Sequence, residues 1–133
     1  MRIGITEIFV EDQDHAVRFY TDVVGFVVTT DAAYGDDGRW ITVVSPEQPD
    51  GPELLLAPMT DAARALQASR AYTGSPALSL TTDDCRRSYE ELCARGATFR
   101  SGPERHDHGG IDAVFEDGCG NLINIHQPAE AAR

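Results

Sequence analysis

Long apolar runs are missing from this 133-residue sequence, and no stretch approaches the ~20 residues that a membrane-spanning helix needs. Basic residues are also few, because 11 of them stand against 22 acidic ones and give a net charge of −11. An acidic protein repels a phosphate backbone, so we expect no nucleic-acid partner and no membrane association. The first residues contain no charged segment followed by an apolar one, which predicts no signal peptide and a cytoplasmic protein.

The sequence contains neither a nucleophile elbow nor a phosphate-binding loop. Cysteines are scarce too. The three cysteines, Cys85, Cys93 and Cys119, are odd in number and their spacing fits no zinc module. Cys85 and Cys93 lie two turns apart on a predicted helix, too far to form a disulfide. We expect reduced thiols, with these two buried and Cys119 in a turn where it can be exposed.

The length and the 41% apolar content predict one globular domain. Strand patterns cover 3–10, 26–30, 40–44, 53–57, 77–81, 97–100, 111–115 and 122–126, with a turn at 34–38 and a polar loop at 101–110. One helical stripe runs from Asp12 to Gly25, another from a start signal at 81–84 to Gly96, and a third helix covers 61–69.

The order β-α-β-β-β therefore occurs twice, as half 1 at about 1–58 and half 2 at about 76–128, joined by a linker helix at about 59–75. We predict an α+β fold in which two βαβββ repeats form a cupped mixed sheet with the helices on its outer face.

Alternation along the strands sorts the residues into two faces. In the first strand Ile8 and Val10 oppose Glu7, and in the last strand the isoleucines oppose Asn124 and His126. The aliphatic face belongs under a helix. The other face mixes polar and apolar groups, which is typical of a ligand cavity, and we predict that the two halves share one.

Two segments carry a family resemblance. In residues 9–26 a strand ends in acidic residues, and a helix bearing Phe19-Tyr20 leads to Val24-Gly25-Phe26. Residues 115–125 contain Asp117 followed by Gly120-Asn121. These segments resemble the opening and the ending of the vicinal oxygen chelate superfamily, which includes glyoxalases, bleomycin-resistance proteins and extradiol dioxygenases. The resemblance covers nearly the whole chain and implies the same βαβββ fold.

Metal-using members of that superfamily hold a divalent ion with four ligands, which the resemblance places at Ile5, Leu55, Ala77 and Asn124. Three of these side chains cannot ligate a metal, and Asn is a weak neutral ligand. We therefore expect no metal and no cofactor. A displaced site that uses Glu7, His126 and water stays open as an alternative. For His106 and His108 we expect a solvated loop rather than a surface metal site.

The resemblance implies two functions. The first is a metal-independent, homodimeric protein that binds a small aromatic or cationic compound, similar to drug-sequestering antibiotic-resistance proteins. Its expected ligand-binding residues are Ile5, Glu7, Trp40, Leu55, Phe115, Asn124 and His126.

The alternative is a lyase, isomerase or dioxygenase-like enzyme with atypical or absent metal ligands and Glu7 and His126 as acid and base. A third possibility is a cup filled by its own side chains or by a partner chain. Whether the halves pair within one chain or exchange between subunits is left open by the sequence.

Overall fold

The computed structural model describes residues 1–36 and 38–130, so Asp37 of the expected turn lies outside the described residues. The elements in chain order are β1 (Ile5–Val10), α1 (Gln13–Arg18), the π-helical turn η1 (Phe19–Val23), β2 (Val27–Tyr34), β3 (Gly38–Val44), β4 (Glu53–Pro58), α2 (Asp61–Thr73), β5 (Leu78–Thr81), α3 (Cys85–Ala94), β6 (Thr98–Arg105), β7 (Ile111–Glu116) and β8 (Leu122–Gln127). The predicted α+β fold of two βαβββ units is confirmed.

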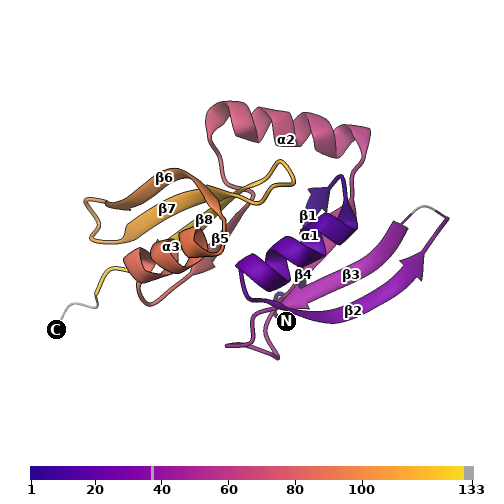
Figure 1. Cartoon of the computed structure of the whole chain (residues 1–133), viewed down its shortest axis with the longest axis horizontal. Helices are drawn as coiled ribbons and strands as arrows, with labels where there is room; N and C mark the ends of the chain where they lie inside the picture. Colours follow the sequence, from indigo (N-terminus) through magenta and orange to yellow (C-terminus); the bar gives the residue numbers. More distant parts are fainter. Residues whose placement is uncertain (37, 131–133) are drawn as a thin grey trace.

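The strands form two separate four-stranded sheets with the same internal order (Figure 1). Sheet A has the order β1-β4-β3-β2 and sheet B the order β5-β8-β7-β6. The first strand of each half pairs in parallel with the last strand, and the other pairs are antiparallel. The two halves therefore repeat one topology, and each sheet keeps its own edges.

The edge strands β2 and β6 are longer than predicted. Strand β2 continues to Tyr34, and β6 extends to Arg105 through the first half of the expected polar loop. Most side chains of these strands are exposed, and β6 pairs with β7 across two register shifts. Backbone pairing holds most of each strand, with few side-chain contacts such as those of Thr29 and Phe99, so their sequences lack the apolar alternation that marks a half-buried strand.

The helices begin and end at the expected residues. Asp12 caps α1 by accepting a hydrogen bond from the backbone N–H of His15 at 3.0 Å, and Asp84 caps α3 in the same way. Gly25 and Gly96 follow with φ of 90° and 102°, a conformation that glycine adopts without strain. Helix α2 extends past the helical pattern at 61–69 but stays within the linker helix expected at about 59–75, and it ends before Gly74, which also has a positive φ.

Each half has its own apolar core between the sheet and its helix. Ile8 and Val10 are buried in the first core, and Ile123 and Ile125 in the second, as strand alternation predicts. Phe19 packs against both cores. The two halves are thus joined through the helix-covered sides of their sheets.

Hydrogen bonds to the buried carboxylate of Asp117 stabilise the junction between the two halves. Asp117 is fully buried, and it accepts hydrogen bonds from the hydroxyl of Tyr20 at 2.8 Å and from the backbone N–H groups of Cys119 and Asn121. Asn121 also donates to Asp117 and to the backbone oxygen of Phe9 in β1. Burial, with the Asp117 charge in addition, raises the pKa of Tyr20 well above its ordinary value. The turn between β7 and β8 is therefore a structural clamp on the first half.

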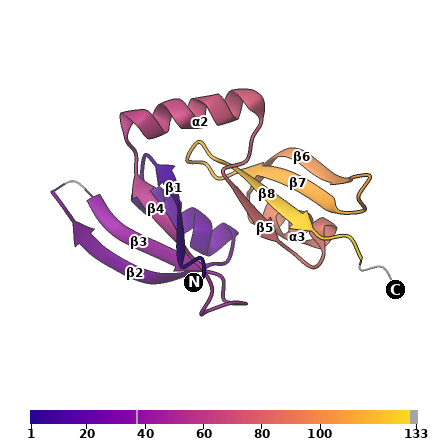
Figure 2. The same cartoon turned by 180° about the vertical axis from the view of Figure 1, so that it is seen from behind.

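Helix α2 bridges the two halves on one side of the molecule (Figures 1 and 2). Gln67 donates hydrogen bonds to the backbone oxygen of Cys119 at 3.0 Å and to the side-chain oxygen of Asn121 at 3.1 Å, which ties α2 to the clamp. Within the described residues, none of the helices has the length and apolar character to cross a bilayer.

Candidate functional site

The face of sheet A opposite its helix, here called open face A, carries four of the residues expected to bind ligand: Ile5, Glu7, Leu55 and Trp40. The register places Glu7 beside Leu55 and Leu55 beside Thr42, so these side chains share one side of the sheet. Trp40 is 38% exposed, and its ring lies 5.8 Å from the ring of Tyr34. Open face A therefore offers a tilted aromatic pair on β2 and β3 and a carboxylate on β1.

Open face A also holds a polar cluster that we did not predict. One carboxylate oxygen of Glu53 accepts hydrogen bonds from the hydroxyls of Thr29 at 2.7 Å and Thr42 at 3.1 Å, and the two hydroxyls are 2.7 Å apart. Thr42 is almost fully buried, so the cluster has a fixed geometry. Both hydroxyls thus orient one oxygen of Glu53, and no hydrogen bond to its other oxygen is found within the described residues.

The corresponding face of sheet B, open face B, carries Asn124 and His126 on β8. Their register neighbours on this face are Ser79 on β5 and Asp112 on β7. Asn124 donates to the Ser79 hydroxyl at 3.0 Å and to Asp112 at 2.9 Å. Nδ1 of His126 lies 2.9 Å from the same Asp112 oxygen.

Asp112 is the centre of open face B. His106 Nε2 lies 3.1 Å from its second oxygen, and His108 stacks on His106 with ring centroids 5.4 Å apart. Partial burial opposes ionisation of Asp112, but the hydrogen bonds from Asn124 and His126 and the nearby imidazoles bring its pKa below its ordinary value. His106 therefore contacts a carboxylate, while its side chain stays exposed in the loop that follows β6.

Phe115 was wrongly expected to contact a ligand. It is fully buried in the second core and packs against Phe99 and Phe19, with ring centroids 5.4 and 6.1 Å away. Its neighbours on β7, Val114 and Glu116, point to open face B. The side of the sheet on which Phe115 lies is the helix-covered one, so it cannot reach that face.

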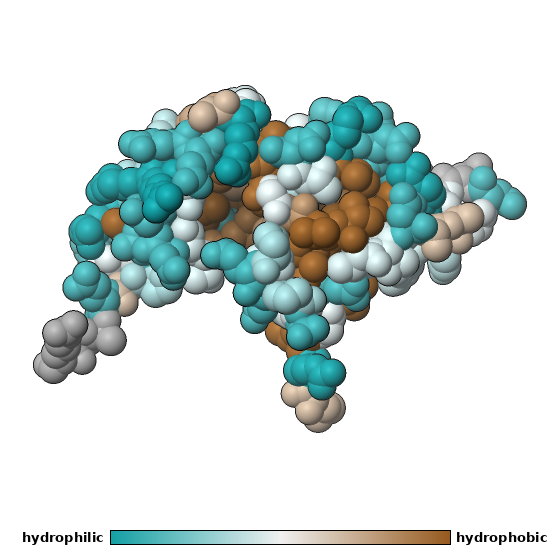
Figure 3. Space-filling model, turned by 60° about the horizontal axis from the view of Figure 1, so that its bottom comes forward, coloured by the Kyte–Doolittle hydropathy of each residue, from teal (hydrophilic) through white to brown (hydrophobic). Residues whose placement is uncertain are grey.

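The two open faces do not meet within one chain. The helix-covered sides of the sheets turn toward each other across a groove of about 790 Å³, here called the central groove. Core-side residues of both sheets line it, including Val43 and Leu54 from sheet A and Leu80 and Ile125 from sheet B. Figure 3 shows apolar side chains gathered on the hollowed side of the molecule. The open faces therefore point outward, and Glu7 and His126 do not form an acid/base pair in a single chain.

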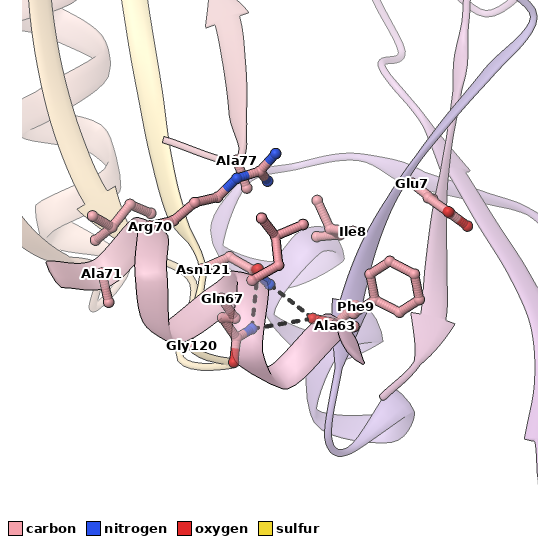
Figure 4. A pocket seen from close by; sticks show the side chains of 12 residues that line it. Glu7, Ile8, Phe9, Ala63, Gln67, Arg70, Ala71, Ala77, Gly120 and Asn121 are labelled. Atoms are coloured by element: carbon pink, nitrogen blue, oxygen red, sulfur yellow. Dashed lines mark hydrogen bonds between the residues drawn. The ribbon is translucent and has the colours of Figure 1, made fainter. Parts of the chain in front are cut away.

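A smaller pocket of about 220 Å³ lies beneath α2 (Figure 4). Residues of β1 and α2 line it together with Ala77 and the turn before β8. The dashed lines in Figure 4 show Gln67 and Asn121 both donating to the backbone of Phe9, and the carboxylate of Glu7 points away from the other labelled side chains. The polar groups of this pocket thus serve the junction of the two halves.

Comparison with known proteins agrees with this geometry. The family model described as Glyoxalase/Bleomycin resistance protein/Dioxygenase superfamily matches residues 2–125. The chain belongs to this superfamily. It is 44% identical over 128 residues to the uncharacterized protein YurT of Bacillus subtilis (strain 168), covering 96% of this chain and 99% of YurT.

Two solved structures of similar length show the same fold. The crystal structure of UcmS2 has a TM-score of 0.80 and 30% identity, and the match covers 95% of this chain and 97% of UcmS2. TnmS3, an antibiotic binding protein from Streptomyces sp. CB03234, has a TM-score of 0.77 and 31% identity, with 97% of each chain covered.

The metal positions of the superfamily do not suit a metal in this member. Ile5 and Leu55 lie on open face A, Ala77 precedes β5, and the amide nitrogen of Asn124 is engaged by Ser79 and Asp112. No group of three or more His, Cys, Asp or Glu side chains suited to a metal ion is found among residues 1–36 and 38–130. The donor set therefore supports no chemistry that runs through a metal at these positions.

The cysteines differ from expectation. Cys93, expected to be buried, is exposed, and Cys119 is buried although it lies in a turn. Burial next to Asp117 raises the pKa of the Cys119 thiol to about 12, which makes it a poor nucleophile. The cysteines thus contribute to neither open face.

Asp112, His106, Thr29 and Thr42 were missed as site residues. The alternation rule would have found Asp112, because Ile111, Ala113 and Phe115 occupy the core side of β7 and leave Asp112 on the other. Thr42 follows in the same way from Ile41 and Val43. Thr29 lies at a register shift in β2, which the sequence gives no means to locate.

Proposed function

We propose that this protein is a metal-independent, homodimeric binding protein for an aromatic or cationic organic compound, working in the cytoplasm. The observation that carries the proposal is the make-up of the open faces. Open face A combines the exposed rings of Trp40 and Tyr34 with a Glu53 carboxylate that accepts hydrogen bonds from threonine hydroxyls. Open face B carries the Asp112 carboxylate, which Asn124 and His126 hold, and the superfamily's metal positions provide no suitable donors. The 31% identical TnmS3 is described as antibiotic binding, which supports a sequestering role of the antibiotic-resistance type.

The dimer is part of the proposal because one chain leaves both open faces incomplete. A ligand cleft encloses most of the ligand surface, whereas a single sheet face covers only one side of it. Open face A of one protomer placed opposite open face B of its partner would make two equivalent clefts, as a two-fold axis requires. Each cleft would then combine Trp40 and Glu7 with Asn124 and His126 of the other protomer.

Intrinsic fluorescence tests ligand binding directly, because Trp40 is the single tryptophan and lies on open face A. A panel of aromatic and cationic compounds is titrated against untagged protein, with and without EDTA. We expect at least one compound to give a saturable change that EDTA does not alter. A panel without any binder, or stoichiometric Ni, Zn, Fe or Mn in elemental analysis, would contradict the proposal.

Mixed dimers test the shared cleft. Trp40→Ala damages open face A and His126→Gln damages open face B, so each variant dimer contains only damaged clefts. Co-expression produces heterodimers in which one cleft carries both changes and the other is intact. Native mass spectrometry should find no ligand on either variant homodimer and one ligand per heterodimer if the cleft is shared. A ligand bound to a variant homodimer through its undamaged face would contradict a shared cleft.

An enzyme remains the second candidate, and the contact of His126 with Asp112 favours it. A carboxylate that holds one imidazole nitrogen leaves the other as a base, an arrangement found in general-base catalysis. Glu7 lies on the other sheet and would come from the partner. Turnover of a bound compound that is lost in both Glu7→Gln and His126→Ala would establish this candidate.

A further inference from the structure

The hydrogen bonds of open face B determine which groups of Asn124 are left for a ligand. The side-chain nitrogen of Asn124 donates to Ser79 Oγ at 3.0 Å and to Asp112 Oδ1 at 2.9 Å. An amide nitrogen has two hydrogens, so both are used. An ionised carboxylate only accepts hydrogen bonds, so the atom of Asn124 that faces Asp112 is the amide nitrogen and not the oxygen. The side-chain oxygen of Asn124 has no hydrogen bond within the described residues and is left as an acceptor.

The same reasoning applies to His126. Asp112 is ionised near neutral pH, so it accepts the hydrogen bond from Nδ1 of His126 at 2.9 Å, and the proton of a neutral imidazole resides on Nδ1. Nε2 then carries a lone pair. The side chain of His126 is 33% exposed, and Nε2 has no hydrogen-bond partner among the residues that the structure describes.

Open face B thus presents two acceptors, two residues apart on β8: the side-chain oxygen of Asn124 and, in the neutral imidazole, Nε2 of His126. Each oxygen of Asp112 already has a partner, in Asn124 and His126 for one and His106 for the other. An ammonium group finds no unengaged carboxylate oxygen on open face B itself and would have to pair with a carboxylate of open face A across the cleft, and an anion meets acceptors only on open face B. A neutral hydroxyl group satisfies the arrangement without an unpaired charge.

We propose that open face B binds a neutral hydroxylated aromatic compound, a phenol or enol, whose O–H donates to Nε2 of His126, with Asp112 as the positioning residue. This inference rests on the proposed binding function and narrows its ligand class. The Asn124 oxygen accepts a second donor of the same compound. Asp112 acts only through His126, because it holds the proton on Nδ1.

A matched set of probes tests the ligand class: 2-naphthol, its methyl ether and 2-naphthoate, titrated calorimetrically at pH 8. One hydrogen bond that the ether cannot make should give 2-naphthol about tenfold higher affinity, and 2-naphthoate should bind more weakly than either. His126→Gln should abolish the difference between 2-naphthol and the ether. His15→Gln, a substitution on α1 away from both open faces, should leave it unchanged.

Asp112→Ala tests the positioning role by a readout that simple loss of structure would not produce. We expect affinity for the ether to be retained while the tenfold preference for 2-naphthol falls toward one. Nitrogen-15 NMR of the imidazoles should show His126 protonated on Nδ1 in the native protein and the proton shifted toward Nε2 in the variant.

Equal affinities for 2-naphthol and the ether, or a native His126 protonated on Nε2, would overturn this inference and leave the binding function standing. Tighter binding of 2-naphthoate would also overturn it. If no compound of the set or of the larger panel binds, the proposed function fails and the inference fails with it.

Discussion

The two halves share one strand order but carry different chemistry on their open faces. Sheet A carries a Glu53 carboxylate held by two threonine hydroxyls and, on the β2–β3 hairpin, an aromatic pair, and in sheet B an amide and two imidazoles surround Asp112. The repeated topology decides which positions point to the open face, whereas the residues at those positions decide what is bound. A fold match alone therefore says little about the ligand.

The largest expected effect is on stability. It distinguishes Phe115 from Trp40, two aromatic residues that the sequence predicted to lie in one ligand site. Phe115→Ala should lower the free energy of unfolding by about 3–5 kcal/mol, because it opens a cavity in the second core. Trp40→Ala should lower it by only about 1 kcal/mol, because that ring is partly exposed. Denaturant unfolding measures both. Equal losses would contradict the assignment of Phe115 to the core and Trp40 to open face A.

The next effect concerns the clamp between the halves. Tyr20→Phe keeps the ring but removes a hydrogen bond to the buried Asp117 carboxylate, which should cost about 1.5–3 kcal/mol of stability. Tyr34→Phe is the matched control, since this ring is 65% exposed, and should change stability by less than about 0.5 kcal/mol. A Tyr20→Phe protein as stable as the wild type would show that the clamp contributes little.

A smaller effect depends on pH and involves only half 2. Hydrogen bonds lower the pKa of Asp112 in the folded state, so its ionised form stabilises the fold above the ordinary value of 3.8, and that contribution is lost as pH falls through the folded-state pKa. Wild type should therefore exceed Asp112→Asn in stability at pH 7, and the difference should shrink below about pH 3.8. Thermal unfolding across pH measures it. If the stability difference between the wild type and Asp112→Asn grew as the pH falls, the lowered pKa of Asp112 in the folded state would be contradicted.

The last prediction changes reactivity rather than stability. Of the three cysteines only Cys93 is exposed, while burial raises the pKa of Cys85 and brings that of Cys119 to about 12. A thiol reagent at pH 8 should therefore label the native protein once per chain, at Cys93, and the denatured protein three times. Mass spectrometry locates the label, and rapid native labelling of Cys119 would contradict its buried position.

The sequence predicts the inner strands well because each has one aliphatic face. The pairs Ile8 and Val10, Leu54 and Leu56, and Ile123 and Ile125 are all buried as alternation requires. The sequence does not predict the full length of the edge strands β2 and β6. These strands pair mainly through their backbones and contain register shifts, so they show no regular apolar pattern. Phe115 shows that an aromatic residue type alone does not predict a ligand contact, because the alternation of β7 places this ring on the core side with Ile111 and Ala113.

The candidate site was less predictable, because its contacts cross between strands. The Asp112–His126 bond depends on the β7–β8 register, and the Glu53 cluster on a bulge in β2. The relative orientation of the two sheets depends on packing around Phe19, which belongs to both cores. Residue types along one strand carry no information on any of these.

The clamp at Asp117 has a consequence for how the protein is made. Its partners Tyr20 and Phe9 leave the ribosome about 100 positions before Asp117 and Asn121. The first half can form its sheet early, but its buried tyrosine has no acceptor until the turn between β7 and β8 has emerged. Completion of half 1 therefore coincides with the folding of half 2.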